Sequence, residues 1–354
     1  MRYKLAVLKN ESSEDHAGWK EACEKKADKI VFEIIDLTMS NWLDKIMDAN
    51  YDYYLTRPPG KTSLFKQLYD ERIYILDRLL KKPIYPTLDE ILIYENKRML
   101  AYWLQANNIP HPKTNIFYNY DEVLKFAESA SFPLVAKSNI GAGGSGVKIY
   151  NERKPLIEYI ESVFSGRGHQ RKWGPNLRKG DYTSRIINRL KNPSETLRYF
   201  RQKKDTVQED IQKGFVILQE YIPCEFEWRV VKIGDSYFAH KKLKSLGQMF
   251  SGTSEVSWDA PSEDLLNFVK MVCDKGGFLS QALDIFEPKP GKFYVNELQA
   301  FFGSKNPHQM IINGKPGRYR PISGEWRFEE GNFNTNNSYD LRLQNVLELL
   351  KKGK

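Results

Sequence analysis

The stretch LDIFEPKPGKFYVNELQ, from Leu283 to Gln299, is the most informative part of this 354-residue sequence. Two apolar runs flank a turn rich in proline and glycine, which predicts an antiparallel β-hairpin. Asp284 lies at the start of the first run and Glu297 near the end of the second, so antiparallel pairing brings the two carboxylates together. Glu297 and Gln299 are two residues apart and share one face of their strand. The hairpin therefore predicts either three oxygen ligands for magnesium, which prefers such ligands, or carboxylates paired with basic residues on a solvated face.

A glycine-rich segment, VAKSNIGAGGSGVK, lies upstream at residues 135–148. Its glycines let the backbone approach a ligand and aim N–H groups at phosphate oxygens, and Lys137 can place its ammonium group on the α- and β-phosphates. A strand rather than a helix follows, so the segment is neither a Walker A loop nor a dinucleotide fingerprint. A hairpin that covers phosphates fits the pattern, with a flexible hairpin turn as the alternative. The residues concerned are Gly141, Gly143, Gly144, Ser145 and Gly146.

An apolar linker lies between these two segments. An apolar strand from Val216 ends in a turn at Pro223, and a charged strand follows it to Gly234. Free backbone groups in an apolar linker suit a flat adenine ring, and an acidic side chain shortly after it suits the ribose hydroxyls. A simple hairpin explains the same pattern equally well.

Residues 1–93 predict a separate α/β domain. Short apolar runs alternate with helical stretches, which indicates a parallel βαβ sheet. The expected strands are Tyr3–Leu8, Ile30–Leu37 and Tyr51–Leu55, and the expected helices are Ser13–Lys29 and Ser40–Asn50. Ligands bind at the carboxyl ends of the strands in such sheets. Arg57 and Lys61, which follow the third strand, are therefore either contacts for an anionic substrate or solvated loop charges.

The rest of the chain mixes helices and strands and shows no internal repeat. The expected helices are residues 95–107, 121–129, 151–165, 262–273 and 338–350. The expected strands are residues 132–137, 146–150, 215–219, 228–233, 237–241, 281–286 and 292–298. Residues 303–331 show no clear pattern and are expected to be irregular.

The positive charge is concentrated in one insert. The chain carries a net charge of +9, and residues 166–204 hold twelve Lys or Arg residues against only Asp181 and Glu195. This insert is expected either to grip an anionic substrate or to be a solvated, partly disordered loop. A third alternative is nucleic-acid binding, with stacking on Trp173, Tyr182, Tyr199 and Phe200.

Composition excludes several other classes of protein. The sequence contains no run of about 18 apolar residues, so no membrane span is expected. Residues 1–10 predict a strand rather than a signal peptide. Cys23, Cys224 and Cys273 are far apart and the five histidines are scattered. This argues against a disulfide scaffold and against a zinc site, and favours a reducing cytoplasm.

In order and approximate spacing, the glycine-rich segment, the linker and the acidic hairpin resemble the ATP-grasp superfamily. Within it they are similar to the carboxylate–amine ligases, such as D-alanine–D-alanine ligase and RimK-type ligases. The resemblance covers residues 95–303 apart from the insert. It implies an ATP-grasp fold of α/β class, with α+β character in the nucleotide domain. The implied domains are an N-terminal Rossmann-like domain (1–93), a central subdomain that contains the insert (94–214) and a C-terminal subdomain with the metal site (215–354).

The resemblance also implies roles for individual residues. Lys97, Lys137 and the glycine-rich segment would bind the phosphates, Glu220 and the Ile222 backbone the adenine, and Glu227 the ribose. Arg229 resembles the arginine of the Asp-x-Arg strand in RimK-like members, and Lys241, with Lys242 or Lys244 as alternates, resembles the residue that contacts the γ-phosphate. Asp284, Glu297 and Gln299 would hold one or two magnesium ions, while Lys305 and His308 would approach the substrate.

Two positions depart from the family pattern. Gln299 stands where asparagine is usual, and Ala282 stands where several ligases carry an arginine that stabilises the tetrahedral intermediate. The second departure leaves two activities open, an ADP-forming carboxylate–amine ligase that works through an acyl phosphate and a small-molecule kinase. For a ligase, the resemblance suggests an anionic sugar-acid or peptide substrate in cell-surface polysaccharide synthesis, and a homodimer.

Overall fold

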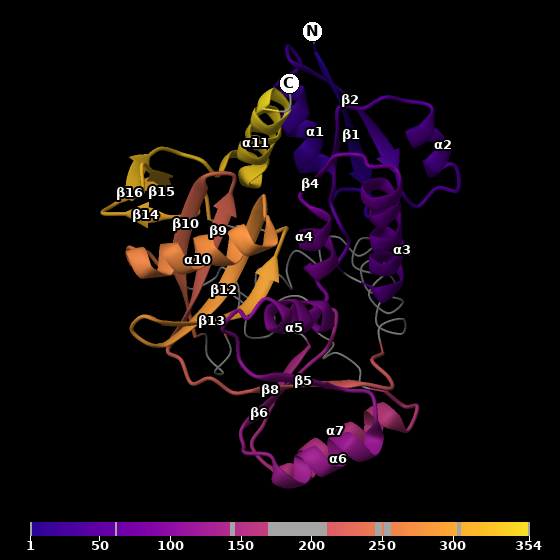
Figure 1. Cartoon of the computed structure of the whole chain (residues 1–354), viewed down its shortest axis with the longest axis vertical. Helices are drawn as coiled ribbons and strands as arrows, with labels where there is room; N and C mark the ends of the chain where they lie inside the picture. Colours follow the sequence, from indigo (N-terminus) through magenta and orange to yellow (C-terminus); the bar gives the residue numbers. More distant parts are fainter. Residues whose placement is uncertain are drawn as a thin grey trace, which may run out of the picture.

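The structure is a computed structural model that describes residues 2–60, 62–141, 146–168, 211–244, 250, 256–302 and 306–352. Its strands form three sheets, which Figure 1 shows as an N-terminal layer, a small sheet at the opposite end of the molecule and a large sheet beside them. The predicted α/β class is confirmed.

The N-terminal sheet is parallel and has the strand order β2-β1-β3-β4. Residues 5–8 of its central strand are completely buried, as expected for a parallel sheet covered on both faces. The strands are β1 (Tyr3–Lys9), β2 (Ile30–Asp36), β3 (Tyr53–Leu55) and β4 (Ile84–Tyr85), and the helices are α1 (Ala17–Glu24), α2 (Trp42–Met47), α3 (Ser63–Tyr74) and α4 (Leu88–Ile93). A π-helical turn, Ile75–Leu79, extends α3.

Both predicted helices of this domain are shorter than expected. The backbone at residues 25–30 closes in successive turns, and the Ser12 N–H bonds to the Asn10 side chain, which favours a turn over a helix. Three elements of this domain were not predicted at all, and the longest of them is the 12-residue helix α3. The strand β4 has only two residues, and α4 is a six-residue helix that begins at a Thr87–Glu90 capping box.

The small sheet is antiparallel, with the order β5-β8-β6-β7. Helices α6 and α7 cover one face of it, and α5 lies between it and the large sheet (Figure 1). Its strands are β5 (Thr114–Phe117), β6 (Leu134–Lys137), β7 (Val147–Tyr150) and β8 (Val216–Glu220), and the helices are α5 (Lys97–Ala106), α6 (Tyr120–Ser129) and α7 (Arg153–Phe164). The predicted glycine-rich hairpin is the β6–β7 pair.

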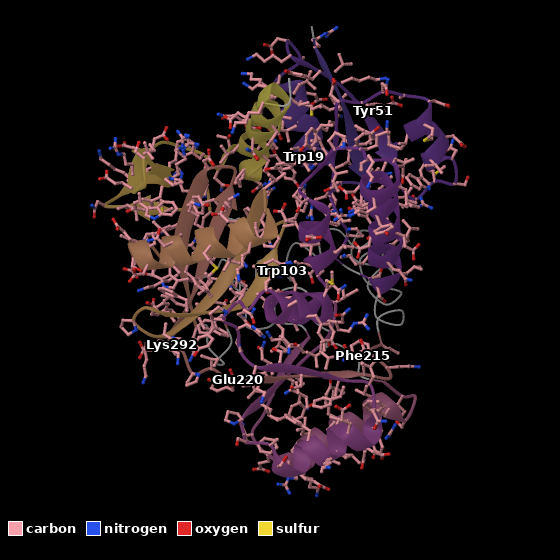
Figure 2. All side chains as sticks on the ribbon, viewed as in Figure 1. Trp19, Tyr51, Trp103, Phe215, Glu220 and Lys292 are labelled. Atoms are coloured by element: carbon pink, nitrogen blue, oxygen red, sulfur yellow. The ribbon has the colours of Figure 1, made fainter. Side chains whose placement is uncertain are left out.

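The large sheet has the order β13-β12-β9-β10-β15-β14, with β11 paired to β10 and β16 to β15. Its strands are β9 (Phe226–Ile233), β10 (Ser236–Leu243), β11 (Val256–Ser257), β12 (Ser280–Lys289), β13 (Lys292–Gln299), β14 (Ile311–Ile312), β15 (Lys315–Ile322) and β16 (Glu325–Glu330). Helix α10 (Glu263–Gly276) packs on it, and Trp103 of α5 contacts Phe278 of the same core (Figure 2).

The expectation that residues 303–331 are irregular is wrong for their second half. Strands β15 and β16 form a regular antiparallel hairpin in that segment. Most of their residues are at least partly exposed, half of them are charged, and Pro316 and Pro321 interrupt the sequence pattern. Alternation of apolar and polar residues is therefore too weak to reveal the hairpin.

The C-terminal helix α11 (Tyr339–Lys352) returns to the N-terminal sheet. Its residues Tyr339, Leu343 and Val346 share a core with Leu5 and Trp19, and it lies beside α1 (Figure 1). The two termini therefore lie at the same end of the molecule. In the part of the chain that the structure describes, no helix has the length and apolar character needed to cross a membrane.

Candidate nucleotide and metal site

One row of the large sheet carries four polar side chains. Glu297, Asp284, Arg229 and His240 are successive register partners across β13, β12, β9 and β10. Directly opposed residues on neighbouring strands share one face of the sheet. The predicted pairing of Asp284 with Glu297 is confirmed, and the row adds a guanidinium and an imidazole to it.

Asp284 is the centre of this row and is 3% exposed. The Nε and Nη2 atoms of Arg229 each donate to its carboxylate at 2.9 Å, and the Nζ of Lys242 donates at 2.7 Å. Burial alone would raise the pKa of Asp284, but these two cations outweigh burial and hold the pKa well below its usual range. Asp284 is therefore ionised at neutral pH, and a fork-shaped donor fixes its orientation.

Glu227, only 2% exposed, lies beside this pair. One of its oxygens pairs with the ammonium group of Lys242, and the other accepts from Asn296 Nδ2 at 2.6 Å. Burial raises the pKa of Glu227, and Lys242 opposes the rise. Because both oxygens are engaged inside the cluster, this arrangement does not favour the expected ribose contact of Glu227. The exposed Glu225, two residues earlier in the linker, is better placed for solvent-side binding, and sequence reasoning passed over it.

Asn296 joins this cluster to Lys137. Its Oδ1 accepts from Lys137 Nζ at 2.8 Å. Asp284 pairs with Glu297 but Ile285 pairs with Val295, so Asn296 is the extra residue of a β-bulge. A bulge redirects a side chain, which explains why Asn296 faces the site although regular alternation would turn it away. The role of Asn296 becomes visible only from the register shift between β12 and β13, and the sequence alone does not predict that shift.

Lys137 ends the fully buried strand β6. Burial lowers the pKa of its ammonium group to about 8, nearby Lys97 adds to the effect, and Glu297 opposes it. A buried lysine with a depressed pKa and several charged neighbours is typical of a functional site.

Lys97 connects Glu297 with the start of the glycine-rich segment. Its Nζ lies 3.7 Å from Glu297 Oε1 and donates to the Gly141 carbonyl at 3.1 Å. The Gly141 N–H in turn donates to Glu95 at 3.1 Å. At Gly146, a Cβ would lie 2.7 Å from the Cβ of Ser138, so only glycine fits there without movement. Residues Gly143, Gly144 and Ser145 lie outside the described residues.

A small cavity between α5 and the small sheet brings both predicted phosphate-binding lysines to one place. It is lined by Lys97, Lys137 and Asn296 together with Leu100, Leu104 and Ile217. Glu220 lies at the end of β8 (Figure 2) and accepts from the Lys113 N–H at 2.8 Å, and Ile222 follows it in the linker. With a volume of about 20 Å³ the cavity has room for about one water molecule, so it marks where the two lysines meet and is not a preformed nucleotide pocket.

Among the alternatives for the γ-phosphate contact, the structure places Lys242 in the cluster and not Lys241. Lys241 lies on the other face of β10, where it pairs with Asp259 at 3.1 Å and lies 4.1 Å from the centroid of the Phe226 ring. Lys244 lies over Phe250. Strand alternation separates Lys242 from Lys241, because residues 240 and 242 share the face of Arg229, whereas Lys244 lies beyond the end of β10.

Among the remaining predicted residues that the structure describes, Gln299 contacts the cluster. Gln299 Oε1 is 3.5 Å from Arg229 Nη2, Arg57 follows β3, and His308 is partly buried after β13. Lys61, Lys305 and residues 169–204 of the basic insert lie outside the described residues.

Comparison with known proteins agrees with this geometry. Residues 97–169 match the family model of the ATP-binding domain of the carbamoyl-phosphate synthase L chain. The carbamoyl phosphate synthase large chain of Clostridium perfringens (strain SM101 / Type A) is 27% identical over 142 residues, which is 39% of this chain but only 12% of that protein. The match therefore spans about an eighth of the length of this relative.

Solved structures extend the likeness to the whole chain. D-alanine–D-alanine ligase from Bacillus anthracis in complex with ATP aligns with a TM-score of 0.55 and 16% identity, covering 99% of this chain and 100% of that one. N5-carboxyaminoimidazole ribonucleotide synthetase from Thermotoga maritima aligns with a TM-score of 0.54 and 12% identity, covering 98% and 76%. At such identities the likeness establishes the fold. The chain therefore has the ATP-grasp fold, and the family model that matches residues 97–169 agrees with it.

Proposed function

We propose that this protein is an ATP- and magnesium-dependent ligase that joins a carboxylate to an amine and releases ADP and phosphate. One observation carries the proposal: four cations (Lys97, Lys137, Arg229 and Lys242) gather with three carboxylates (Glu227, Asp284 and Glu297) beside a glycine-rich hairpin. The surplus of positive charge suits a polyphosphate. The names of the structural neighbours, a ligase and a synthetase, support the same class of reaction.

The residues fit magnesium. Asp284 and Glu297 are register partners, Gln299 adds an amide oxygen on the same face, and all three supply the oxygen donors that this ion prefers. When bound, magnesium would neutralise the triphosphate and polarise its γ-phosphoryl group. Arg229 and Lys242 bond to both oxygens of Asp284 in this structure, so magnesium would displace part of these contacts when it binds.

The chain's own residues would act mainly by position and charge. Lys97, Lys137 and the backbone of the glycine-rich hairpin would hold the phosphates, and Lys242 would face the γ-phosphate. Glu220 and the Ile222 backbone would bind adenine, with Glu225 as the ribose acceptor.

With the nucleotide held in this way, a substrate carboxylate would attack the γ-phosphorus in line, which expels ADP and forms an acyl phosphate. An amine would then attack the acyl carbon, expel phosphate and leave an amide. The resemblance and the basic insert favour an anionic sugar-acid or peptide substrate in cell-surface polysaccharide synthesis, handled in the cytoplasm.

The test is ADP release by the purified full chain with Mg-ATP and pooled carboxylic acids, with and without pooled amines. We expect turnover only with both pools, loss of turnover in Glu297→Ala and no change in the control Glu325→Ala, which alters an exposed carboxylate of β16. Turnover with a hydroxyl acceptor alone would assign a kinase, the activity that Ala282 leaves open. Failure to bind Mg-ATP would overturn the proposal.

A further inference from the structure

Two arginines from distant parts of the chain contact the same aromatic ring. Arg57 follows β3 of the N-terminal sheet, and Arg342 belongs to α11. Their guanidinium carbons lie 5.0 and 5.1 Å from the centroid of the Phe301 ring. Phe301 comes two residues after Gln299, so this arginine pair lies next to the acidic hairpin of the candidate metal site.

Arg342 is 1% exposed, and its charge is not neutralised by an acid. Its Nε donates to Ser280 Oγ at 3.0 Å, but its Nη2 has no hydrogen-bond partner among the described residues. Phe302 and Tyr339 contribute two further aromatic rings around it. The rings stabilise the cation in part, but burying a guanidinium group without a directly bonded anion is costly, so Arg342 retains the capacity to bind one.

The buried carboxylate that acts electrostatically on Arg342 is that of Glu90. Its oxygens accept from the backbone N–H groups of Thr87, Leu279 and Ser280 at 2.7–3.0 Å. Glu90 is therefore engaged in joining α4 to β12. No ion pair to either arginine occurs within the ranges that the structure covers.

Arg57 is also weakly satisfied. Among the described residues, its Nη1 has two long contacts, each of 3.4 Å, to the Pro58 carbonyl and the Tyr94 hydroxyl. It is partly exposed, so it forms the solvent-facing member of the pair, while Arg342 forms the buried member. Its position at the carboxyl end of a parallel strand is where open α/β sheets bind ligands.

We propose that Arg57 and Arg342 form a subsite for a second anionic group, a carboxylate or a phosphate, on the acid substrate. The proposal rests on the proposed function, because the substrate's other carboxylate is the one that would be phosphorylated beside Asp284 and Glu297. Planar guanidinium groups suit both kinds of oxyanion, since they donate two parallel hydrogen bonds. The substrate class is then an acid with at least two negative charges.

The test titrates inorganic phosphate and succinate into the full chain by calorimetry, at constant ionic strength and with saturating Mg-AMPPNP so that the nucleotide site is filled. We expect saturable binding of at least one anion, and its identity distinguishes phosphate from carboxylate recognition. Binding should weaken about ten-fold or more in Arg57→Gln and in Arg342→Met, because each removes a charge-assisted hydrogen bond. The control Lys351→Met, an exposed charge on the same helix, should bind as the wild type does.

Stability gives a second readout that a merely structural arginine would not produce. Methionine fills similar space without a buried charge, so ligand-free Arg342→Met should melt at the same temperature as the wild type or higher. The proposal is overturned if neither anion binds the wild type saturably, or if binding is unchanged in both arginine variants. Absence of Mg-AMPPNP binding by the wild type would instead overturn the proposed function, and the anion titration would still be informative.

Discussion

At the scale of single residues, the site consists of buried charged side chains, each of which is stabilised by a neighbour of opposite charge. Asp284 is buried and ionised because Arg229 and Lys242 both bond to it. The sequence showed that Asp284 and Glu297 would meet, because hairpin pairing follows from a turn and two apolar runs. It could not show that cations from two other strands would hold Asp284, because those contacts depend on the strand order β13-β12-β9-β10.

Asp284→Asn should therefore lower the free energy of unfolding by about 3–5 kcal/mol, because it leaves the buried Arg229 without its anion and removes one of the two carboxylates that pair with Lys242. In the wild type, folding lowers the pKa of Asp284 below the ordinary value of 3.8. The stabilisation that Asp284 provides is therefore fully present above pH 3.8 and is lost as the pH falls towards the folded pKa. Urea unfolding at neutral pH measures the effect. The control is Asp259→Asn, which removes a half-exposed pair with Lys241 and should cost less than about 1 kcal/mol. Equal costs for the two variants would contradict the buried-network account.

If Lys137 binds the phosphates as proposed, we expect the nucleotide affinity to depend on pH. The folded pKa of Lys137 is about 8 and lies below the ordinary value of 10.5 because of burial. Phosphate oxygens favour the charged form, so binding should take up a proton near pH 8, and Mg-AMPPNP affinity should fall as pH rises from 7 to 9.5. Calorimetry in buffers of different ionisation enthalpy measures this proton uptake. Lys137→Met should bind more weakly and lose the uptake, whereas uptake that persists in this variant would assign the proton to another group.

At the scale of elements, the β-bulge in β13 decides which side chains face the buried charge cluster. Regular alternation predicts Glu297 and Gln299 on one face but leaves Asn296 on the other. The bulge brings Asn296 between Lys137 and Glu227. Local sequence does not specify such a register shift, just as it did not reveal the charged hairpin of β15 and β16, because both depend on pairing with neighbouring strands.

Asn296→Ala should weaken Mg-AMPPNP binding about ten-fold, since it removes one hydrogen bond from buried Lys137 and one from buried Glu227. The loss should appear in the dissociation constant measured by calorimetry. Asn267→Ala, which removes a surface amide that bonds to Trp326, is the matched control and should leave the affinity unchanged. If Asn296→Ala binds as tightly as the control, the bulge has no role in the site.

At the scale of the whole molecule, α11 links the two ends of the chain and the two sides of the proposed active site. Its apolar residues Leu343 and Val346 complete the N-terminal core, while Arg342 reaches Ser280 at the start of β12, the strand that carries Asp284. The sequence predicted an amphipathic helix here from its spacing of leucines. The sequence did not indicate that the helix would pack on the first sheet rather than on the C-terminal elements that precede it. An apolar stripe shows that a helix face is buried, but it does not specify which element covers that face.

Leu343→Ala tests this link. Leu343 is 1% exposed, so truncation should lower the free energy of unfolding by about 2–5 kcal/mol through lost burial and a residual cavity. Because α11 also contacts β12, we expect one cooperative urea transition rather than early loss of the N-terminal sheet alone, and saturating Mg-AMPPNP should restore part of the lost stability by binding only the folded chain. Far-ultraviolet circular dichroism, compared with tryptophan fluorescence from Trp19 and the other tryptophans, measures whether the transitions coincide. Two separate transitions would show that α11 stabilises the N-terminal domain without coupling it to the strand that holds Asp284.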